Sequence, residues 1–95
     1  MLCLKGNFEK LYKLYYPKMF AFAQNYVPAN EDAENIVQDV FLILWERKDE
    51  IEISFTLTTY LFTLVKNRCL NFLRHKLIEE EYNSQMKEEL RFKLY

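Results

Sequence analysis

Apolar side chains recur at steps of three and four residues through most of this chain, which is the periodicity of an amphipathic α-helix. The first such stretch predicts a helix from about Asn7 to Val27, with Pro17 inside it as a point of kinking or splitting. The dipeptide Pro28-Ala29 should prevent the helix from continuing. The apolar stripe of this helix consists of Phe8, Leu11, Leu14, Tyr15, Met19, Phe22 and Tyr26.

A second stripe predicts a helix from about Glu31 to Arg47, with Asn30 as its N-cap. Acidic residues in its first turn suit the positive end of the helix dipole. Residues 51–54 alternate between apolar and polar side chains, but they have no partner strand, so we expect a loop there. The core face of the helix consists of Ala33, Ile36, Val37, Val40, Phe41 and Leu44.

A third stripe predicts a helix from about Leu57 to Lys76, capped by Thr56 or Thr58. The charged residues 79–95 lack such a stripe, and we expect them to form a helical tail. The apolar positions of the third helix are Tyr60, Leu61, Leu64, Val65, Leu70, Phe72 and Leu73.

One glycine and two prolines among 95 residues are too few for the turns of an all-β fold. A hydrophobic content of 51% is too high for a disordered chain. We therefore predict an all-α fold, a compact bundle of three main helices over residues 1–78. Residues 79–95 would be the charged helical tail or the start of an inter-domain linker. The predicted core residues are Ile36, Val40, Leu44, Leu61, Val65 and Phe72.

Residues able to carry covalent or metal chemistry are scattered along the chain. Cys3 and Cys69 share no metal-ligand spacing, and a disulfide between them is left open. The only histidine, His75, lies in a basic run, as a surface residue or an aid to a phosphate contact. Ser54 and Ser84 lack the flanking glycines of a nucleophile elbow. We expect no enzyme, no metal, no cofactor and no small-molecule substrate. Without a signal peptide or a membrane span, we expect a cytoplasmic protein.

The charges are arranged in blocks along the sequence. Residues 1–30 carry a net charge of +3, residues 31–53 of −6, residues 54–78 of +4 and residues 79–95 of −2. The block of residues 54–78 contains no acid at all. Either these blocks are ordinary charged helix surfaces, or the acidic and basic blocks are two surfaces meant for two different partners.

The second helix has an unusual outer face. A solvated face would carry lysine or glutamate at positions 42 and 45, but this one carries leucine and tryptophan beside an amide and an acid. Apolar anchors among polar groups are typical of an interface with a partner. The alternative is that the helix is central and buried on most sides. The residues of this outer face are Asn35, Gln38, Asp39, Leu42 and Trp45.

The third helix has a polar face with Thr63, Asn67, Asn71 and Arg74 at helical spacing. Amides read base edges and arginine binds phosphate, so this face suits a nucleic acid. Aromatic side chains near the helix start suit stacking on unpaired bases, although aromatic residues at this spacing are more often buried in a core. They are Phe55, Tyr60 and Phe62.

Three motifs together resemble region 2 of bacterial extracytoplasmic-function (ECF) sigma factors, and in particular those of Bacteroidetes. Residues 8–19, FEKLYKLYYPKM, are similar to the first conserved segment of that family. Residues 32–45, DAENIVQDVFLILW, are similar to the second segment and make the most specific match. Residues 59–74, TYLFTLVKNRCLNFLR, resemble the helix that recognises the −10 promoter element. The motifs occur in the family's order and at its separations.

The resemblance implies a transcription initiation factor domain that docks on RNA polymerase and melts promoter DNA. The second helix would bind the coiled coil of the polymerase β′ clamp through Asn35, Gln38, Asp39, Leu42 and Trp45. The loop before the third helix, with the first turns of that helix, would hold a base flipped out of the −10 non-template strand. The expected DNA-binding residues are Phe55, Tyr60, Thr63, Lys66, Asn67, Arg68, Asn71, Arg74 and Lys76.

The sequence departs from the family pattern in three ways. Asn71 stands where family members often have aspartate, and the loop before the third helix is acidic. Region 4, the helix-turn-helix that reads the −35 element, is not found before Tyr95.

The resemblance also implies a membrane-anchored anti-sigma factor as a partner. The alternative function is a helical module that binds protein only, such as a degenerate sigma fragment that binds an anti-sigma factor.

Overall fold

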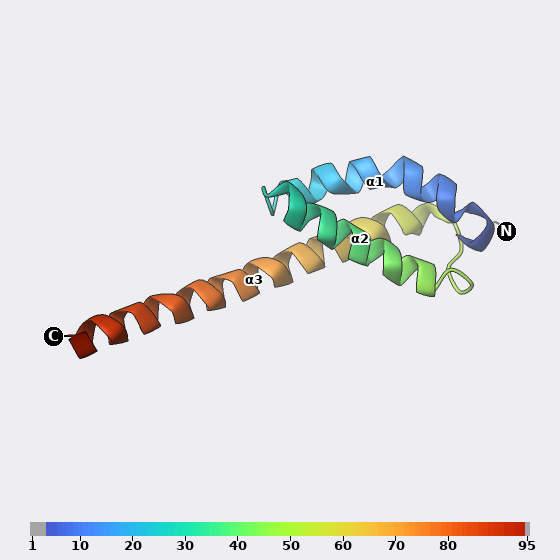
Figure 1. The fold of residues 1–95 in the computed structure, drawn as a ribbon. Coiled ribbons are helices and arrows are strands. Elements are labelled where there is room, and N and C mark those ends of the chain that lie inside the picture. Colours follow the sequence, from blue (N-terminus) through green and yellow to red (C-terminus); the bar gives the residue numbers. More distant parts are fainter. Residues whose placement is uncertain (1–3, 95) are drawn as a thin grey trace.

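The computed structural model describes the backbone of residues 4–94 and the side chains of residue 4 and residues 6–83. A short 3-10 helix, η1, spans Leu4–Asn7 and leads into α1 (Phe8–Gln24), α2 (Asn30–Glu46) and α3 (Phe55–Leu94) (Figure 1). Helices account for most of the chain, and the described residues form no strand. The predicted all-α class is confirmed.

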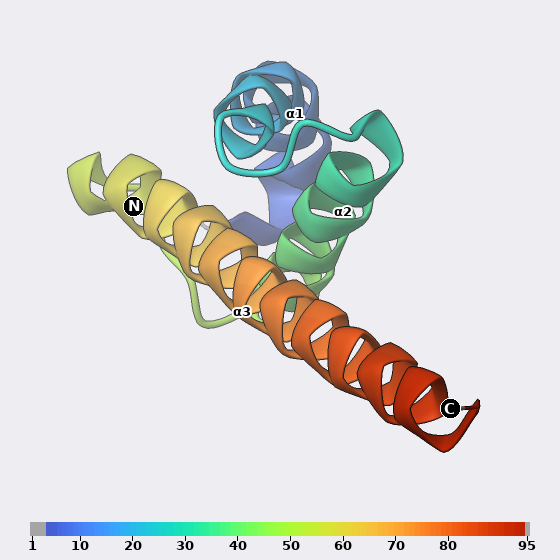
Figure 2. The ribbon, with the colours of Figure 1, turned by 90° about the vertical axis from the view of Figure 1, so that its left-hand side faces the viewer.

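Each of the three α-helices packs against the other two. α1 and α2 lie side by side, and the first half of α3 crosses behind both (Figures 1 and 2). The second half of α3 runs on beyond the bundle, so that the C-terminal end lies far from the other helices. This overhang explains principal extents of 69 × 22 × 18 Å, because a helix of 40 residues is about 60 Å long.

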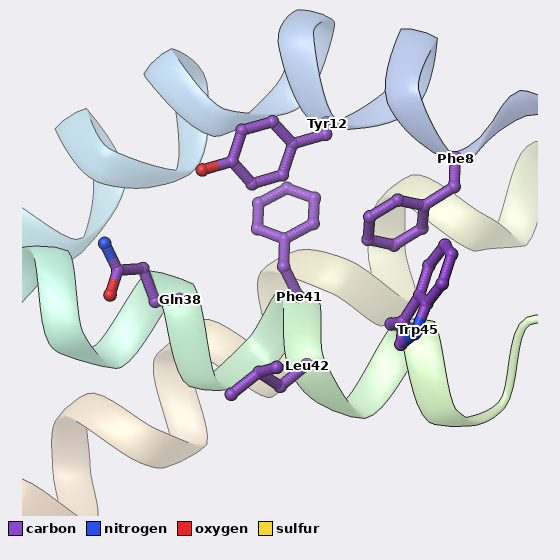
Figure 3. Close-up of a pocket in the computed structure, with 6 residues that line it drawn as sticks. All are labelled: Phe8, Tyr12, Gln38, Phe41, Leu42 and Trp45. Carbon is purple, nitrogen blue, oxygen red and sulfur yellow. The ribbon is translucent and has the colours of Figure 1, made fainter.

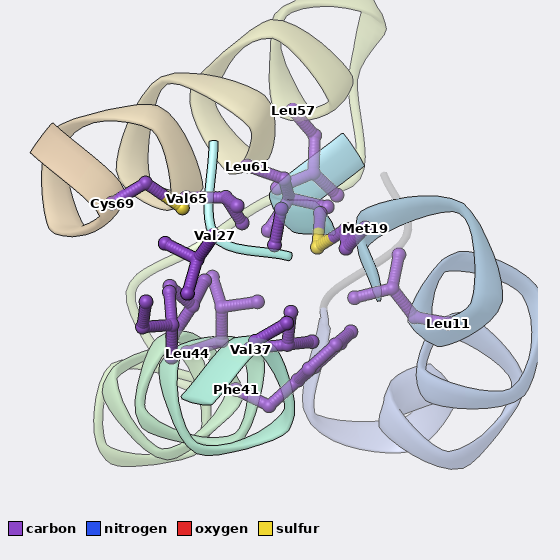
Figure 4. Close-up of a cluster of buried hydrophobic side chains, with 14 of the residues drawn as sticks. Leu11, Met19, Val27, Val37, Phe41, Leu44, Leu57, Leu61, Val65 and Cys69 are labelled. Carbon is purple, nitrogen blue, oxygen red and sulfur yellow. The ribbon is translucent and has the colours of Figure 1, made fainter. Parts of the chain in front are cut away.

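The core lies where the three helices meet (Figure 4). Five of the six predicted core residues are buried, and Phe72 is only half-buried because α3 leaves the bundle near that position. The sulfur-containing side chains of Met19 and Cys69 are also completely buried among the aliphatic residues. The fully buried larger side chains are Leu4, Met19, Val37, Val40, Leu44, Leu61, Val65 and Cys69.

Pro17 does not split α1, and the C-terminal end of the helix differs from its prediction. The helix continues unbroken through Pro17, whose side chain is exposed, so water can bind the backbone carbonyl left without a partner. The helix ends at Gln24 instead of Val27. Val27 instead packs into the core, and its N–H donates to the carbonyl of Ala23 at 2.8 Å in the closing turn.

The predicted N-cap of α2 is wrong. Ala29 is the extended N-cap residue, with φ −66° and ψ 123°, and Asn30 is already the first residue of the helix. The amide of Asn30 is used elsewhere, because its Oδ1 accepts a hydrogen bond from Nε2 of Gln24 at 2.6 Å. This bond ties the end of α1 to the start of α2. Glu31 and Asp32 lie in the first turn of α2, as predicted, where their negative charge suits the positive end of the helix dipole.

The bounds of α3 also differ from the prediction. The helix begins at Phe55, so Thr56 and Thr58 lie inside it, and it continues to Leu94 instead of ending at Lys76. The physical reason is the absence of a stop signal, since no glycine or proline occurs after Pro28. The charged segment 79–94 is therefore the direct continuation of α3.

The connection between α2 and α3 is a loop, as predicted for residues 51–54. Ile51 and Ile53 are half-buried against the core. The carbonyl of Ile51 accepts a hydrogen bond from the N–H of Leu4 at 3.1 Å. The buried side chain of Leu4 and this bond hold the loop against the start of the chain.

We predict that Val40→Asp unfolds the domain. Val40 is fully buried, and an unpaired carboxylate there should cost about 3–5 kcal/mol of the free energy of unfolding. The measurement is thermal melting followed by circular dichroism. Asn35→Asp places the same side chain on the exposed side of the same helix and should melt like the parent. Equal melting of Val40→Asp and the parent would contradict the orientation of α2.

We predict that Cys69 reacts slowly with alkylating agents in the native protein. Its side chain is fully buried, and burial raises the pKa of the thiol, so little thiolate forms or meets solvent. In a Cys3→Ser background at about pH 8, alkylation should be roughly ten-fold or more slower than in guanidinium chloride. Equal rates in native buffer and in denaturant would show that α3 does not bury this position against the other two helices.

Candidate functional site

The outer face of α2 is open to solvent. All five residues predicted to contact a partner are exposed, and the two apolar ones are the most unusual: Leu42 is 58% exposed and Trp45 is 47% exposed. The alternative prediction, that α2 is buried on most sides, is therefore wrong. A helix that buries one face and exposes a leucine and a tryptophan on the other is typical of an interface.

A cluster of aromatic rings joins this face of α2 to α1. The ring of Phe8 lies edge-on to Trp45, with centroids 5.0 Å apart, and edge-on to Phe41 at 6.2 Å. The ring of Tyr12 lies 4.8 Å from that of Phe41. Lys48 covers Trp45, with its Nζ 4.0 Å from the ring centroid. These contacts hold Trp45 in place beside the groove between the two helices.

The cluster encloses a hollow of about 320 Å³ that opens between α1 and α2 (Figure 3). Two of its residues, Phe8 and Tyr12, come from α1 and were not predicted as site residues. Tyr12 falls outside the apolar stripe of α1 that the sequence predicts to be buried. An aromatic residue on that outer side was the sequence feature that could have identified Tyr12 as a site residue. The hollow is lined by Phe8, Tyr12, Gln38, Phe41, Leu42 and Trp45.

Tyr16 marks the other end of this α1–α2 groove. Partial burial raises the pKa of its phenol, and the negative charge of Glu34 on α2 acts in the same direction. A hydrogen bond with Gln38 acts in the opposite direction. The phenol therefore stays protonated near neutral pH and can serve as a hydrogen-bond donor to α2.

The polar face of α3 is exposed as predicted. Asn67, Asn71 and Arg74 all point to solvent, and so do Lys66 and Lys76. Thr63 is exposed too, but its hydroxyl donates to the carbonyl of Thr59 at 2.7 Å, which leaves only its lone pairs for a ligand. Nζ of Lys76 lies 5.8 Å from the ring centroid of Phe72.

The three aromatic residues near the start of α3 have different surroundings. Phe55 is completely exposed at the first position of the helix, whereas Tyr60 is half-buried. Phe62 packs edge-on against Phe22 of α1, with ring centroids 5.0 Å apart. Phe62 thus belongs to the core side of α3, and Phe55 is the ring that is free to stack on a ligand.

One ion pair joins the two predicted surfaces. Nη1 of Arg68 on α3 lies 3.8 Å from Oδ2 of Asp39 on α2, and the two side chains are 43% and 55% exposed. At this distance and exposure the pair contributes little to stability. It lies in a cleft of about 460 Å³ that also brings Asn71 and His75 next to α2. The cleft is lined by Ile36, Asp39, Arg68, Asn71, Phe72 and His75.

A smaller hollow of about 250 Å³ lies where the loop before α3 meets α1. Tyr15 and Thr58 share a hydrogen bond of 2.8 Å between their hydroxyl oxygens at its edge. The sequence predicted a pocket at this loop, but Phe55 and Tyr60 do not line it. α1 supplies the residues that the prediction missed. The hollow is lined by Asn7, Lys10, Leu11, Leu14, Tyr15, Ile53, Ser54, Leu57 and Thr58.

The described part of the chain holds no group of three histidine, cysteine or acidic side chains arranged for a metal ion. Within the same residues, no helix is both long enough and apolar enough to cross a membrane. The candidate site consists of two exposed helix faces and the hollows beside them.

Comparison with known protein families identifies one family. The model of the family described as sigma-70 region 2 matches residues 11–77, well over half of the chain. No curated protein and no solved structure matches the chain. The matched residues include all of α2 and the part of α3 that packs in the bundle. The chain therefore belongs to the sigma-70 region 2 family, whose members are non-enzymatic domains of transcription initiation factors that bind RNA polymerase and take part in promoter recognition.

Proposed function

We propose that the outer face of α2 docks on the β′ clamp coiled coil and that the polar face of α3 holds the −10 non-template strand. The observation that carries this proposal is the pairing of two exposed faces of opposite character on adjacent helices. α2 carries acids and two exposed apolar anchors, whereas residues 54–78 carry four bases and no acid. Opposite charge on neighbouring faces suits a protein partner on one side and DNA on the other.

The docking part rests on the outer face of α2. Leu42 and Trp45 supply exposed apolar area. The exposed side chains of Gln38 and Asp39 lie on the same face, where a partner helix would compete with the hydrogen bond between Gln38 and Tyr16 and with the ion pair between Asp39 and Arg68. Interfaces gain most of their affinity from such apolar anchors, and the polar rim fixes orientation. The β′ coiled coil is the partner that the second motif implies.

The DNA part rests on α3 and on the hollow at the preceding loop. Asn67 and Asn71 would face bases, while Lys66 and Arg74 would contact phosphates. The hollow of about 250 Å³ beside Thr58 would receive the extruded base. Melting needs no covalent chemistry, because trapping an extruded base offsets an unstacking cost of a few kcal/mol.

The three motifs further support assignment to the ECF type. A sigma factor of this type would act in the cytoplasm and would be held inactive by an anti-sigma factor anchored in the membrane. The exposed faces of α2 and α3 are the surfaces that such an inhibitor would cover.

A second candidate function is a module that binds protein only. The ion pair between Arg68 and Asp39 favours it, because Arg68 is then engaged by α2 and less available to phosphate. The acidic loop residues Glu50 and Glu52 are exposed at the end where DNA would lie, and they would repel phosphates. DNA binding by the isolated chain separates the two functions.

We predict that Gln38→Ala combined with Asp39→Ala weakens binding to the isolated β′ clamp coiled coil by roughly ten-fold, because polar contacts of the docking face are lost. The measurement is isothermal titration, with helicity checked by circular dichroism. Glu80→Ala with Asn83→Ala removes an acid and an amide from the exposed tail and should bind like the parent. Equal binding by both double variants would exclude Gln38 and Asp39 from the interface.

We predict weak binding of single-stranded −10-like DNA that exceeds binding of duplex and falls as salt rises. With roughly two to four phosphates neutralised, the log–log salt slope should be about −1.5 to −3. The measurement is fluorescence anisotropy on labelled oligonucleotides that differ by one base.

Two variants refine the DNA prediction. Arg74→Ala should weaken all oligonucleotides alike, whereas Asn67→Ala should mainly erase the preference at one base. A uniform loss with Asn67→Ala would mean that Asn67 is no base reader. If no oligonucleotide binds at low salt, the protein-only function is the better proposal.

A further inference from the structure

The hollow between α1 and α2, called here the aromatic hollow, directly adjoins the face of α2 proposed to contact polymerase. Figure 3 shows the rings of Phe8, Tyr12, Phe41 and Trp45 along the facing sides of the two helices, with Leu42 and Gln38 on α2 beside them. Its volume is about 320 Å³, enough for a large side chain and too small for a helix. An occupant would therefore insert a single side chain.

The walls of the aromatic hollow are held by ring contacts before any partner arrives. Phe8 meets Phe41 edge-on at an interplanar angle of 89° and Trp45 at 69°. Tyr12 meets Phe41 at 62° and Tyr16 at a centroid distance of 5.2 Å. The first three of these contacts are edge-to-face, a packing that is favourable and directional, so their rings keep their positions. A preformed pocket binds with little loss of side-chain entropy.

The chemistry of the lining selects an apolar occupant. Five of the six lining residues present rings or aliphatic carbons, and Gln38 is the one amide. Leu42, Trp45 and Tyr12 are large apolar side chains that stay exposed around the opening. Aliphatic and aromatic side chains gain the most from leaving water at such a place.

The charge around the aromatic hollow favours particular residues next to the inserted side chain in the partner. Along α2 (Asn30–Glu46) there are five acids and no base. Asp39 belongs to the outer face, Glu46 directly follows Trp45, and both acids are exposed. One base, Lys48, lies over the ring of Trp45 at the edge of the hollow. A partner segment with arginine or lysine around its apolar residue is therefore favoured over an acidic one.

We propose that the aromatic hollow is an anchor pocket for one apolar side chain of an amphipathic helix in the β′ clamp coiled coil, with basic residues on either side of that anchor. Phe8 and Tyr12 of α1 then belong to the docking surface together with α2. This inference rests on the proposed docking of α2 and adds the pocket, the chemistry of the anchor and the contribution of α1.

The first test uses Trp45, the only tryptophan among the 95 residues. The isolated coiled coil, with its own tryptophans replaced by phenylalanine, is titrated into the chain while emission is recorded. Insertion of an apolar side chain removes water from the indole, so emission should shift to shorter wavelength and acrylamide quenching should fall. Binding seen by isothermal titration without any change in Trp45 emission overturns the proposal.

The second test removes one wall of the aromatic hollow. Tyr12→Ala should weaken binding of the coiled coil by roughly ten-fold, the effect typical of a moderate anchor contact. Tyr82→Ala makes the same change on the exposed overhang of α3 and should leave binding unchanged. Circular dichroism checks that both variants keep the helicity of the parent. If Tyr12→Ala does not fold, the Trp45 titration of the parent chain still tests the proposal.

The outcomes separate this inference from the docking proposal. If Gln38→Ala with Asp39→Ala weakens binding but Tyr12→Ala does not, the anchor pocket is wrong and docking by α2 stands. If the parent does not bind the coiled coil at all, the docking proposal is wrong, and the anchor-pocket proposal that rests on it is wrong too. If Trp45 emission changes with protein concentration alone and sedimentation gives a dimer, the occupant is a second copy, which also overturns the proposal.

Discussion

The burial of one side of α2 between α1 and α3 is the interaction on which the rest of the molecule depends. Val37, Val40 and Leu44 are fully buried there, and a helix of 17 residues would be only marginally stable in water without such packing. Once that side is fixed in the core, helical geometry turns Leu42 and Trp45 outward. The same packing sets α1 beside α2, which creates the aromatic hollow, and sets α3 across both.

Periodicity predicted the three helices and the inward side of each, because burial of an apolar stripe needs no knowledge of the partner helix. Family membership was also predicted from the motifs, although the ECF subdivision remains a proposal. The tail was predicted to be helical, but its continuity with the third helix was not, although residues 77–94 contain no glycine or proline to end the helix. Contacts between helices could not be predicted from the sequence. The pairing of Phe8 with Trp45, for example, depends on how α1 and α2 cross.

The ion pair between Arg68 and Asp39 is another contact that only the packing of α2 on α3 creates. It joins a residue assigned to polymerase with a residue assigned to DNA. If polymerase engages Asp39, Arg68 is released toward phosphate, and by linkage DNA on Arg68 favours docking through Asp39. An exposed pair at 3.8 Å is worth at most about 1 kcal/mol, so this coupling would be a few-fold effect.

The weak charge of the chain as a whole fits a domain whose DNA contact depends on prior docking. With a net charge of −1, the chain cannot concentrate itself on DNA by its overall field. Under the proposed function, docking through α2 would hold α3 near the promoter at an effective concentration of about millimolar, at which even a weak site is occupied. A basic block confined to residues 54–78 is then sufficient. Under the proposed function the acidic α2 would not oppose it, because polymerase would cover that face before DNA arrives.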